Sequence, residues 1–379
     1  MSSMAIDRRQ LLIGTALVLA SSSRAFAGVA ELAGDEEGDT VAAGDLIAAC
    51  KRPDGSYSVV ILRLDGTIVR EVPLQGRGHD IAYAPGSGQA VVFARRPGSF
   101  ALAFDVHGAR EPVLFATPAN RHFYGHGVFS ADARLLYATE HDNDTRAGVL
   151  GVYDATGGFK RIGEFPTYGI GPHEVILLSD GRTLAVANGG IETHIETGRE
   201  KLNVDTMVPS LAFIDSASGA LLAQHKHAGP LHKLSIRHIA ADAQGAVWFG
   251  GQWEGEAGDT PELVGCASID KPLRLIETAA PMGAGLAGYI GAVAISGDRQ
   301  VLAASAPRAG RIIYVDTERG AVVGETQLID GCGVTGIAPA DFALSSGMGV
   351  VQSERPDHTH LTTASFPGRA FDNHLRLIR

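Results

Sequence analysis

The sequence predicts an all-β protein, a seven-bladed β-propeller with four-stranded antiparallel blades. A strand-start motif recurs along the chain, and four of its copies carry a histidine: Gly78-His79-Asp80-Ile81, Gly125-His126-Gly127-Val128, Pro172-His173-Glu174-Val175 and Arg237-His238-Ile239-Ala240. Most copies are followed by a turn and a second apolar strand, which is the repeating unit of a propeller. About 340 residues follow the N-terminal leader, enough for seven repeats of roughly 45 to 50 residues each.

Turn residues mark the later strands of each repeat. The phrases Val152-Tyr153-Asp154, Phe213-Ile214-Asp215 and Tyr314-Val315-Asp316 each precede a turn with glycine, as expected before a tight hairpin between third and fourth strands. The expected blades are 42–74, 78–118, 122–166, 169–226, 232–278, 288–328 and 331–378. We expect the last of them to supply strands that help to close the ring.

The first residues resemble an export signal. Arg8 and Arg9 precede an apolar run, Ile13 to Ala20, and Ala25-Phe26-Ala27 is a small-x-small cleavage site. Paired arginines before a modest apolar segment are typical of the twin-arginine route, and the alternative is an ordinary Sec signal. We therefore expect a signal peptide at 1–27, a flexible acidic leader at 28–41, a single propeller domain at 42–379 and a periplasmic protein.

The charge and apolar pattern restrict the partners. The formal net charge is −10, and removal of the signal, with three arginines and one aspartate, makes it more negative. Nucleic acid is not expected as a partner, because phosphate binding requires a basic face. Outside the signal, no stretch approaches the ~20 apolar residues of a membrane span. We expect a monomer without a membrane span.

The three cysteines cannot all pair within one chain. Cys50 and Cys266 lie in apolar, strand-like surroundings and are expected to be buried thiols. Cys332 lies in Asp330-Gly331-Cys332-Gly333, just before an innermost strand. A role as ligand or reactive thiol is the alternative for Cys332, although position alone does not lower a thiol pKa.

Propeller geometry predicts that the histidines converge. The start of each innermost strand and the loop after each second strand open on the same end of the channel. We expect His126, His173 and His238 to meet Glu140 there and to bind one metal ion. Imidazoles with a carboxylate suit iron, zinc or copper, whereas an all-oxygen set would suggest calcium. The alternative is that each histidine caps backbone groups or bonds a neighbouring carboxylate.

Residues after second strands and one long insertion are expected at the same end of the channel. Asn188, Gln252 and Arg308 follow second strands, and the insertion Gly189 to Pro209 leaves the fourth blade there as an expected rim or lid. That insertion carries Glu192, His194, Glu196, Lys201 and Asp205. No Cys-x-x-Cys or His-Glu-x-x-His spacing occurs, so the metal hypothesis depends on convergence alone.

Several local phrases resemble a known family. Arg161 to Glu174, Ala187 to His194, Ser235 to His238 and Asp372 to Leu375 are similar to exported bacterial proteins known only as a domain of unknown function, number 1513. The resemblance runs from about residue 45 to the end and includes the twin-arginine leader. It implies a part in periplasmic iron acquisition, because relatives tend to be encoded near imelysin-like and dihaem peroxidase-like proteins. Positions that match the family's motifs are His126, Glu140, His173, Asn188, His194, Arg237, His238, Gln252, Arg308, Cys332, Asn373 and His374.

These observations lead to one expectation and two alternatives. The propeller is expected to bind iron, another transition metal or an iron complex through His126, Glu140, His173 and His238, with Asn188, Arg237, Gln252 and Arg308 contacting the complex. Its expected partners are an iron complex or other periplasmic iron-uptake proteins. The first alternative is a calcium-dependent, lactonase-like hydrolase that uses Glu140 and Asn188 as metal ligands. The second is a protein-interaction platform without small-molecule chemistry.

Overall fold

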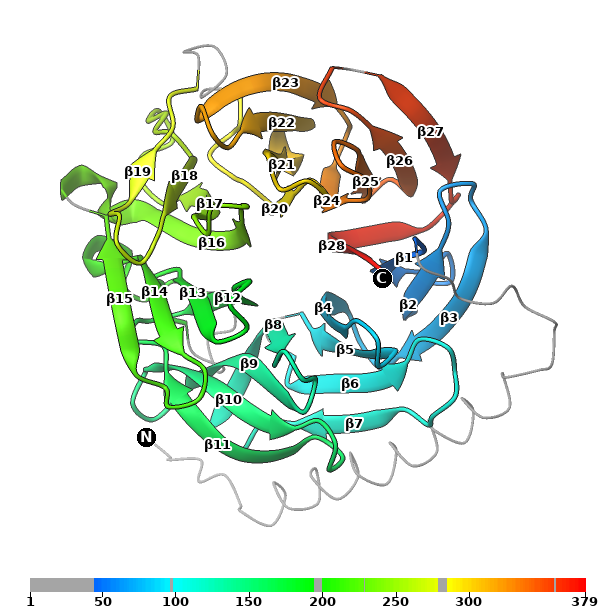
Figure 1. The fold of residues 1–379 in the computed structure, drawn as a ribbon, viewed down its shortest axis with the longest axis horizontal. Helices are drawn as coiled ribbons and strands as arrows, with labels where there is room; N and C mark the ends of the chain where they lie inside the picture. The colour runs from blue at the N-terminus through cyan, green and yellow to red at the C-terminus, as the bar shows by residue number, and fades with distance from the viewer. Residues whose placement is uncertain (1–43, 96–97, 194–199, 228, 279–284, 358) are drawn as a thin grey trace, which may run out of the picture. The chain divides into compact units, whose positions relative to one another are not determined.

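The computed structural model has seven four-stranded antiparallel sheets arranged in a ring (Figure 1). It describes residues 44–379 except 96–97, 194–199, 228, 279–284 and 358. The predicted seven-bladed propeller is therefore confirmed. The expected signal peptide and acidic leader lie outside the described residues, as do His194 and Glu196 of the insertion.

The strands of each blade are named here in order from the central channel outwards. Blade one contains β28 (Ala370–Leu377), β1 (Leu46–Lys51), β2 (Tyr57–Leu62) and β3 (Ile68–Leu74). Blade two contains β4 (Gly78–Ala84), β5 (Gln89–Ala94), β6 (Phe100–Asp105) and β7 (Val113–Ala116). Blade three contains β8 (Arg121–Phe129), β9 (Leu135–Asp142), β10 (Gly148–Asp154) and β11 (Lys160–Pro166). Blade four contains β12 (Pro172–Leu177), β13 (Thr183–Asn188), β14 (Ser210–Asp215) and β15 (Leu221–Lys226).

The remaining blades follow the same order. Blade five contains β16 (Leu234–Ala241), β17 (Val247–Trp253), β18 (Val264–Ala267) and β19 (Arg274–Leu275). Blade six contains β20 (Ala292–Ile295), β21 (Val301–Ala306), β22 (Arg311–Asp316) and β23 (Ala321–Gln327). Blade seven contains β24 (Gly331–Gly336), β25 (Phe342–Ser346), β26 (Val350–Glu354) and β27 (His360–Ser365). The described residues also form three short 3-10 helices in connections: η1 (Val204–Thr206), η2 (Gly229–Lys233) and η3 (Pro307–Ala309).

The ring closes through the C-terminal strand. β28 pairs antiparallel with β1, so that Leu46 faces Leu377 and Cys50 faces Phe371. The expected seventh blade, 331–378, is therefore too long by one strand, because its last strand belongs to the first blade. The pairing covers the inner edge of β1, which would otherwise expose unpaired backbone groups.

The turn residues act as the sequence predicted. Oδ1 of Asp154, Asp215 and Asp316 accepts backbone N–H groups of the following turn, from Thr156 at 2.9 Å, Ser218 at 2.9 Å and Arg319 at 2.8 Å respectively. An aspartate that accepts from the backbone two or three residues on fixes a tight turn. These bonds hold the third and fourth strands of blades three, four and six as hairpins.

Apolar side chains fill the space between neighbouring blades. Between blades three and four, Tyr137 and Leu150 pack with Leu184, Val186 and Ala212, all of them buried. Cys50, Cys266 and Cys332 are buried and free, as expected for Cys50 and Cys266. No helix among the described residues is long and apolar enough to span a membrane.

Candidate metal centre and basic cavity

Five histidines, each from a different innermost strand, meet in the channel. His79 lies on β4, His126 on β8, His173 on β12, His238 on β16 and His374 on β28. Ring centroids of neighbours are 4.6 Å apart for His173 and His238, 4.7 Å for His79 and His374, and 4.8 Å for His126 and His173. Two groups of three, His79 with His126 and His173, and His126 with His238 and His374, place one nitrogen of each ring within 4.8 Å of the others. We call these five residues the histidine cluster.

β-bulges aim the histidines at the channel. On β4 two residues, His79 and Asp80, face one residue of β5, and on β12 the extra residue is His173 itself. On β16 the extra residue is Arg237, directly before His238. Similar shifts surround His126 on β8 and His374 on β28. Because a bulge breaks the alternation of side chains and bends the strand, it can turn polar groups out of the blade interior.

Three of the histidine rings are hydrogen-bonded to carboxylates that belong to the neighbouring blade. Nδ1 of His79 lies 2.9 Å from Asp372, Nδ1 of His126 lies 2.9 Å from Asp80, and Nδ1 of His238 lies 3.2 Å from Glu174. In each pair the acid lies on the preceding blade's innermost strand. An ionised carboxylate only accepts hydrogen bonds, so Nδ1–H donates and Nε2 keeps its lone pair. Carboxylate-backed imidazoles of this kind are typical of metal ligands in proteins.

Arginines neutralise these buried acids. Arg376 donates to Asp80 at 2.7 Å and 3.0 Å and to Glu174 at 3.2 Å. Burial by itself raises the pKa of Asp80, but Arg376 and the adjacent histidines outweigh it and hold that pKa well below its usual range. Burial also opposes ionisation of Asp372, yet its bond from His79 and the charge of Arg95 lower its pKa well below the usual range. The carboxylates are therefore ionised acceptors at neutral pH.

Burial favours the neutral form of four of these histidines, His79, His173, His238 and His374. Burial lowers the pKa of His79 to about 3, against the raising effect of its bond to Asp372. Burial holds the pKa of His173 and of His374 well below the ordinary value and also lowers that of His238. Neutral imidazole is the form that binds metal ions.

Some buried nitrogens of the cluster have no partner. Within the described residues, Nε2 of His126, Nε2 of His374 and Nδ1 of His173 make no hydrogen bond. Such atoms normally find a partner when they are buried. These nitrogens suit a metal ion, since imidazole lone pairs are usual ligands of transition metals.

The structure brings together three of the four expected ligands. His126, His173 and His238 belong to the histidine cluster, but Glu140 does not. Its carboxylate accepts from Tyr153 Oη at 2.5 Å and from Arg161 Nη2 at 2.9 Å, inside blade three, and burial raises its pKa. The expectation for Glu140 fails because β9 continues to Asp142, so Glu140 lies within the strand and not after it.

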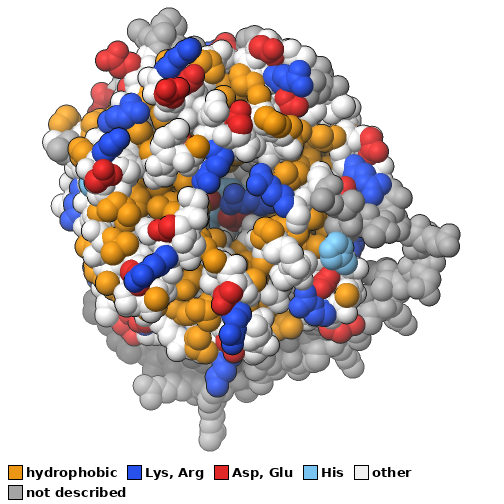
Figure 2. Space-filling view, in the orientation of Figure 1, with side chains coloured by type: hydrophobic (Ala, Val, Ile, Leu, Met, Phe, Trp, Pro, Cys, Tyr) orange, Lys and Arg blue, Asp and Glu red, His pale blue; other side chains and the backbone are white. Residues whose placement is uncertain are grey.

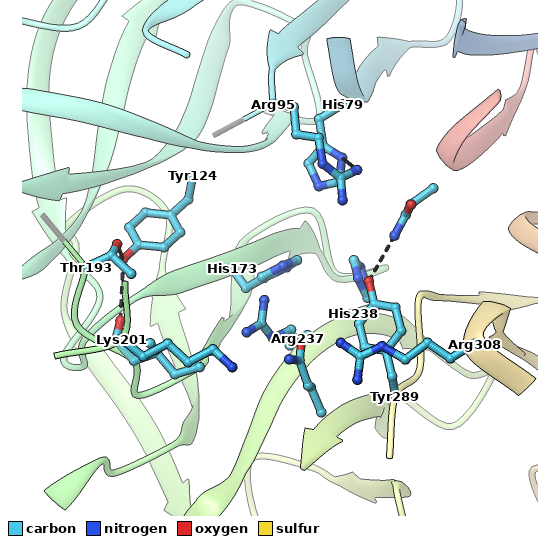
Figure 3. A pocket seen from close by; sticks show the side chains of 13 residues that line it. His79, Arg95, Tyr124, His173, Thr193, Lys201, Arg237, His238, Tyr289 and Arg308 are labelled. Atoms are coloured by element: carbon cyan, nitrogen blue, oxygen red, sulfur yellow. Dashed lines mark hydrogen bonds between the residues drawn. The ribbon is translucent and has the colours of Figure 1, made fainter. Parts of the chain in front are cut away.

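A cavity of about 380 Å³ opens beside the histidine cluster (Figure 3). Its thirteen lining residues are His79, Arg95, Tyr124, His173, Ile191, Thr193, Lys201, Arg237, His238, Gln252, Tyr289, Arg308 and Asn373. Three residues expected to contact a metal complex are among them, Arg237, Gln252 and Arg308. Asn188 is not, because its amide donates to Thr167 O at 2.9 Å, in the connection before blade four, and to Ser210 Oγ at 3.2 Å on β14.

The insertion of blade four forms one side of this cavity. Ile191, Thr193 and Lys201 line it, and Lys201 pairs with Glu254 of blade five. At its far end Asp205 pairs with Lys233 at 2.9 Å. The described parts of the insertion are thus bound to blade five, which is the position expected for a rim.

The sequence did not predict two histidines of the cluster as ligands, nor the three carboxylates that support the rings. The sequence places His79 among the converging histidines and His374 only among the family's motif positions, neither of them as a ligand, and it does not identify the supporting acids. A usable signal was present, because Asp80 and Glu174 directly follow histidines on their strands and Asp372 precedes His374 by two. Each acid, however, supports a histidine of the next blade, which only the ring geometry reveals.

Cys332 does not join the cluster. Its Sγ contacts Asp372 O at 3.3 Å, and burial raises the pKa of the thiol to about 12. The thiol is therefore protonated at neutral pH and is a weak nucleophile.

The opposite end of the channel has a smaller cavity with a more apolar lining. A second cavity of about 270 Å³ lies between the later residues of the innermost strands, among them Ile81, Val128, Val175 and Leu377. Arg376 and Arg379 are its charged lining residues. On the face in Figure 2, Lys and Arg side chains lie in the central hollow and hydrophobic side chains are scattered around it. The histidine cluster and its carboxylates separate the two cavities.

The fold has distant structural relatives. Hydrazine synthase of Kuenenia stuttgartiensis aligns with a TM-score of 0.59 and 15% identity, over 85% of this chain and 99% of that one. The β-propeller domain of Cps50 (Swd1) from Myceliophteria thermophila aligns with a TM-score of 0.54 and 10% identity, over 88% of this chain and 97% of that one. At such identities the likeness concerns the fold alone.

Sequence comparison assigns the family. No curated protein matches the chain. Residues 72–378 match the family described as "Protein of unknown function (DUF1513)", a range that contains all five cluster histidines and every residue lining the cavity. The chain belongs to the DUF1513 family of proteins of unknown function.

Proposed function

We propose that this propeller binds a transition-metal ion through the histidine cluster, with iron as the ion that the sequence resemblance implies. The observation that carries the proposal is the set of buried imidazole nitrogens at His126, His173 and His374 that have no hydrogen-bond partner in the described part of the chain. Burial of such groups without a partner costs about 1–3 kcal/mol each, and an ion would offset that cost.

The donor set decides the class of metal. Imidazole nitrogens suit iron, copper, zinc and nickel, whereas calcium and magnesium prefer oxygen. Two donors on one ion with bonds of about 2.1 Å lie at most about 4.2 Å apart. The spacing of up to 4.8 Å in each histidine group therefore needs only small side-chain movements.

The calcium-hydrolase alternative has less support. It relies on Glu140 and Asn188, whose side chains bond to different partners inside blades three and four. The interaction-platform alternative offers no reason for five convergent imidazoles. Metal binding accounts for the neutral histidines and their carboxylates together.

Titration calorimetry tests the proposal directly. The metal-free protein is titrated with Fe²⁺ under anaerobic conditions, and with Cu²⁺, Zn²⁺ and Ca²⁺. We expect binding of a transition ion and none of Ca²⁺. We expect His173→Ala to weaken that binding at least tenfold without unfolding the chain, because Nδ1 of His173 makes no hydrogen bond among the described residues. His107→Ala, in the exposed turn after β6, is the control. Equal binding by parent and His173→Ala, or binding of Ca²⁺ alone, would refute the proposal.

A periplasmic location by the twin-arginine route is part of the same proposal. Export after folding would allow a chain with a closed ring to reach an iron-acquisition system outside the cytoplasm. Replacement of Arg8 and Arg9 by lysine is expected to leave precursor in the cytoplasm, as measured by fractionation. Unchanged export would point to the Sec route.

A further inference from the structure

We propose that the cavity beside the histidine cluster is a subsite for a multiply charged oxyanion, a polycarboxylate or a phosphate, which binds together with the metal ion. This inference rests on the proposed metal site and adds the chemistry of the ion's companion. The metal would then be held as an anionic complex and not as a bare ion.

The charge of the cavity supports an anion. Four of its lining residues are cationic, Arg95, Lys201, Arg237 and Arg308, and none is an aspartate or glutamate among those described. Two carboxylates outside the lining offset part of this charge: Asp372 pairs with Arg95 at 2.5 Å, and Glu254 pairs with Arg237 at 3.6 Å and also with Lys201. Among the residues that the structure describes, a surplus of two positive charges remains at this cavity, in a protein whose formal net charge is −10.

Arg308 is the least satisfied of these cations. Within the described chain it forms no ion pair, and its guanidinium lies 4.6 Å from the centre of the Tyr289 ring. Stacking on an aromatic face fixes the orientation of a guanidinium while leaving its N–H groups free. Tyr289 is itself held by Asn373, whose Nδ2 donates to its Oη at 3.0 Å. The Tyr289 hydroxyl hydrogen can therefore donate to a ligand.

The cavity also has the size and depth that an anion needs. Its volume of about 380 Å³ equals the share of roughly a dozen water molecules at about 30 Å³ each, far more than one ion requires. The side chains of Arg237 and Arg95 are only 11% and 17% exposed, so their charges are weakly screened. Figure 3 shows these arginines on the same cavity as His79, His173 and His238, so one ligand can contact both groups.

The experiment measures anion and metal separately. Citrate, pyrophosphate and acetate are each titrated into the metal-free protein and into protein loaded with the ion that binds best. We expect citrate or pyrophosphate to bind the loaded form at least tenfold more tightly than the metal-free form, and acetate to bind weakly. The preference between citrate and pyrophosphate identifies the source as carboxylate or phosphate.

Arginine variants locate the anion. Arg237→Gln and Arg308→Gln are each expected to weaken anion binding about tenfold or more, since each removes charge-assisted hydrogen bonds. Loading with the bare ion in the absence of anion, measured by mass spectrometry, should stay unchanged in Arg308→Gln. Arg237→Gln is left out of this comparison, because Arg237 is the bulge residue directly before His238. Arg319→Gln, exposed on the hairpin of blade six, removes the same charge and should have no effect. An equal loss in Arg319→Gln would mean a long-range charge effect and would overturn the subsite.

The two proposals fail in different ways. A chain that binds metal but none of the anions keeps the metal site and refutes the subsite. A chain that takes up no metal, yet binds citrate or pyrophosphate through Arg237 and Arg308, refutes the metal site and keeps the anion site.

Discussion

Single residues decide whether the histidine rings can approach one another. Gly125 has a φ of +101°, on the strand that carries His126. A Cβ at this position would lie 2.8 Å from Cδ2 of His79. The absence of a side chain therefore permits both the bulge of β8 and the close packing of His79 with His126.

Gly125→Ala is expected to disturb the cluster. The left-handed backbone and the clash with His79 together should lower the free energy of unfolding by about 2–5 kcal/mol. Metal affinity should fall as well, because His79 must move. Chemical denaturation and metal titration measure the two effects. Gly163→Ala is the control, since a Cβ there meets nothing within 4 Å. A stable variant with unchanged affinity would show that the close packing is not required.

Burial of neutral histidines should make the metal-free fold sensitive to acid. The histidine pKa is about 6.5 in the unfolded chain, whereas burial lowers the pKa of His79 to about 3 in the folded chain and also lowers that of His173, His238 and His374. The unfolded state therefore binds protons first, and stability falls as the pH drops below about 6.5. Each histidine that stays neutral when folded costs about 1.4 kcal/mol between about pH 7.5 and pH 5.5.

Denaturation curves at several pH values check this expectation. His173→Gln should flatten the dependence by the amount of one histidine, whereas His107→Gln, at an exposed position, should leave it as in the parent. The depressed carboxylate pKa of Asp372 acts in the same direction, but only below its unfolded pKa near 4. Stability that is flat between pH 7.5 and 5.5 would contradict the burial of neutral imidazoles.

At the scale of elements, pairs of innermost strands build the site. Glu174 of β12 bonds His238 of β16 and Arg376 of β28, so it joins three strands. Glu174→Gln should keep the shape but remove the charge that orients His238. Loss of a carboxylate that supports a metal-binding histidine lowers metal affinity by about 10–100-fold. Metal titration measures it, and Glu325→Gln, which alters the ion pair with Arg311 in blade six, is the control. Affinity within twofold of the parent would refute the role of Glu174.

The same scale explains which site residues the sequence could predict. His126, His173 and His238 start strands of a repeating unit, and the repeat alone implies that they meet around one axis. Glu140 and Asn188 were expected at the channel mouth but lie inside their blades. The residue at which a second strand ends, and the face on which its side chains lie, depend on the pairing register with the neighbouring strand. The bulges at His79 and Arg237 change the register by one residue, and a sequence pattern of period two does not reveal them. The supporting acids depend on contacts between blades, which lie beyond any local pattern.

At the scale of the whole ring, the seven-blade architecture followed from regular spacing, but its closure depends on residues at opposite ends of the chain. β28 contributes Asp372 and His374 to the site and also covers β1. Gly44 N donates to Ile378 O at 2.9 Å, so the two ends of the described chain are adjacent. The strand that closes the ring therefore also contributes to the histidine cluster.

Removal of β28 should destroy both. A chain that ends at Arg369 lacks Asp372 and His374 and leaves the inner edge of β1 unpaired, so we expect loss of cooperative unfolding and of metal binding, measured by circular dichroism and titration. A circular permutant tests whether the effect comes from the loss of β28 or only from a change in where the chain begins and ends. It joins Arg379 to Gly44 by a short linker and begins at Gly368, which makes blade one continuous. This permutant keeps every strand, and it should fold and bind metal as the parent does. A truncated chain that unfolds at the parent's midpoint would show that the ring does not need its closing strand.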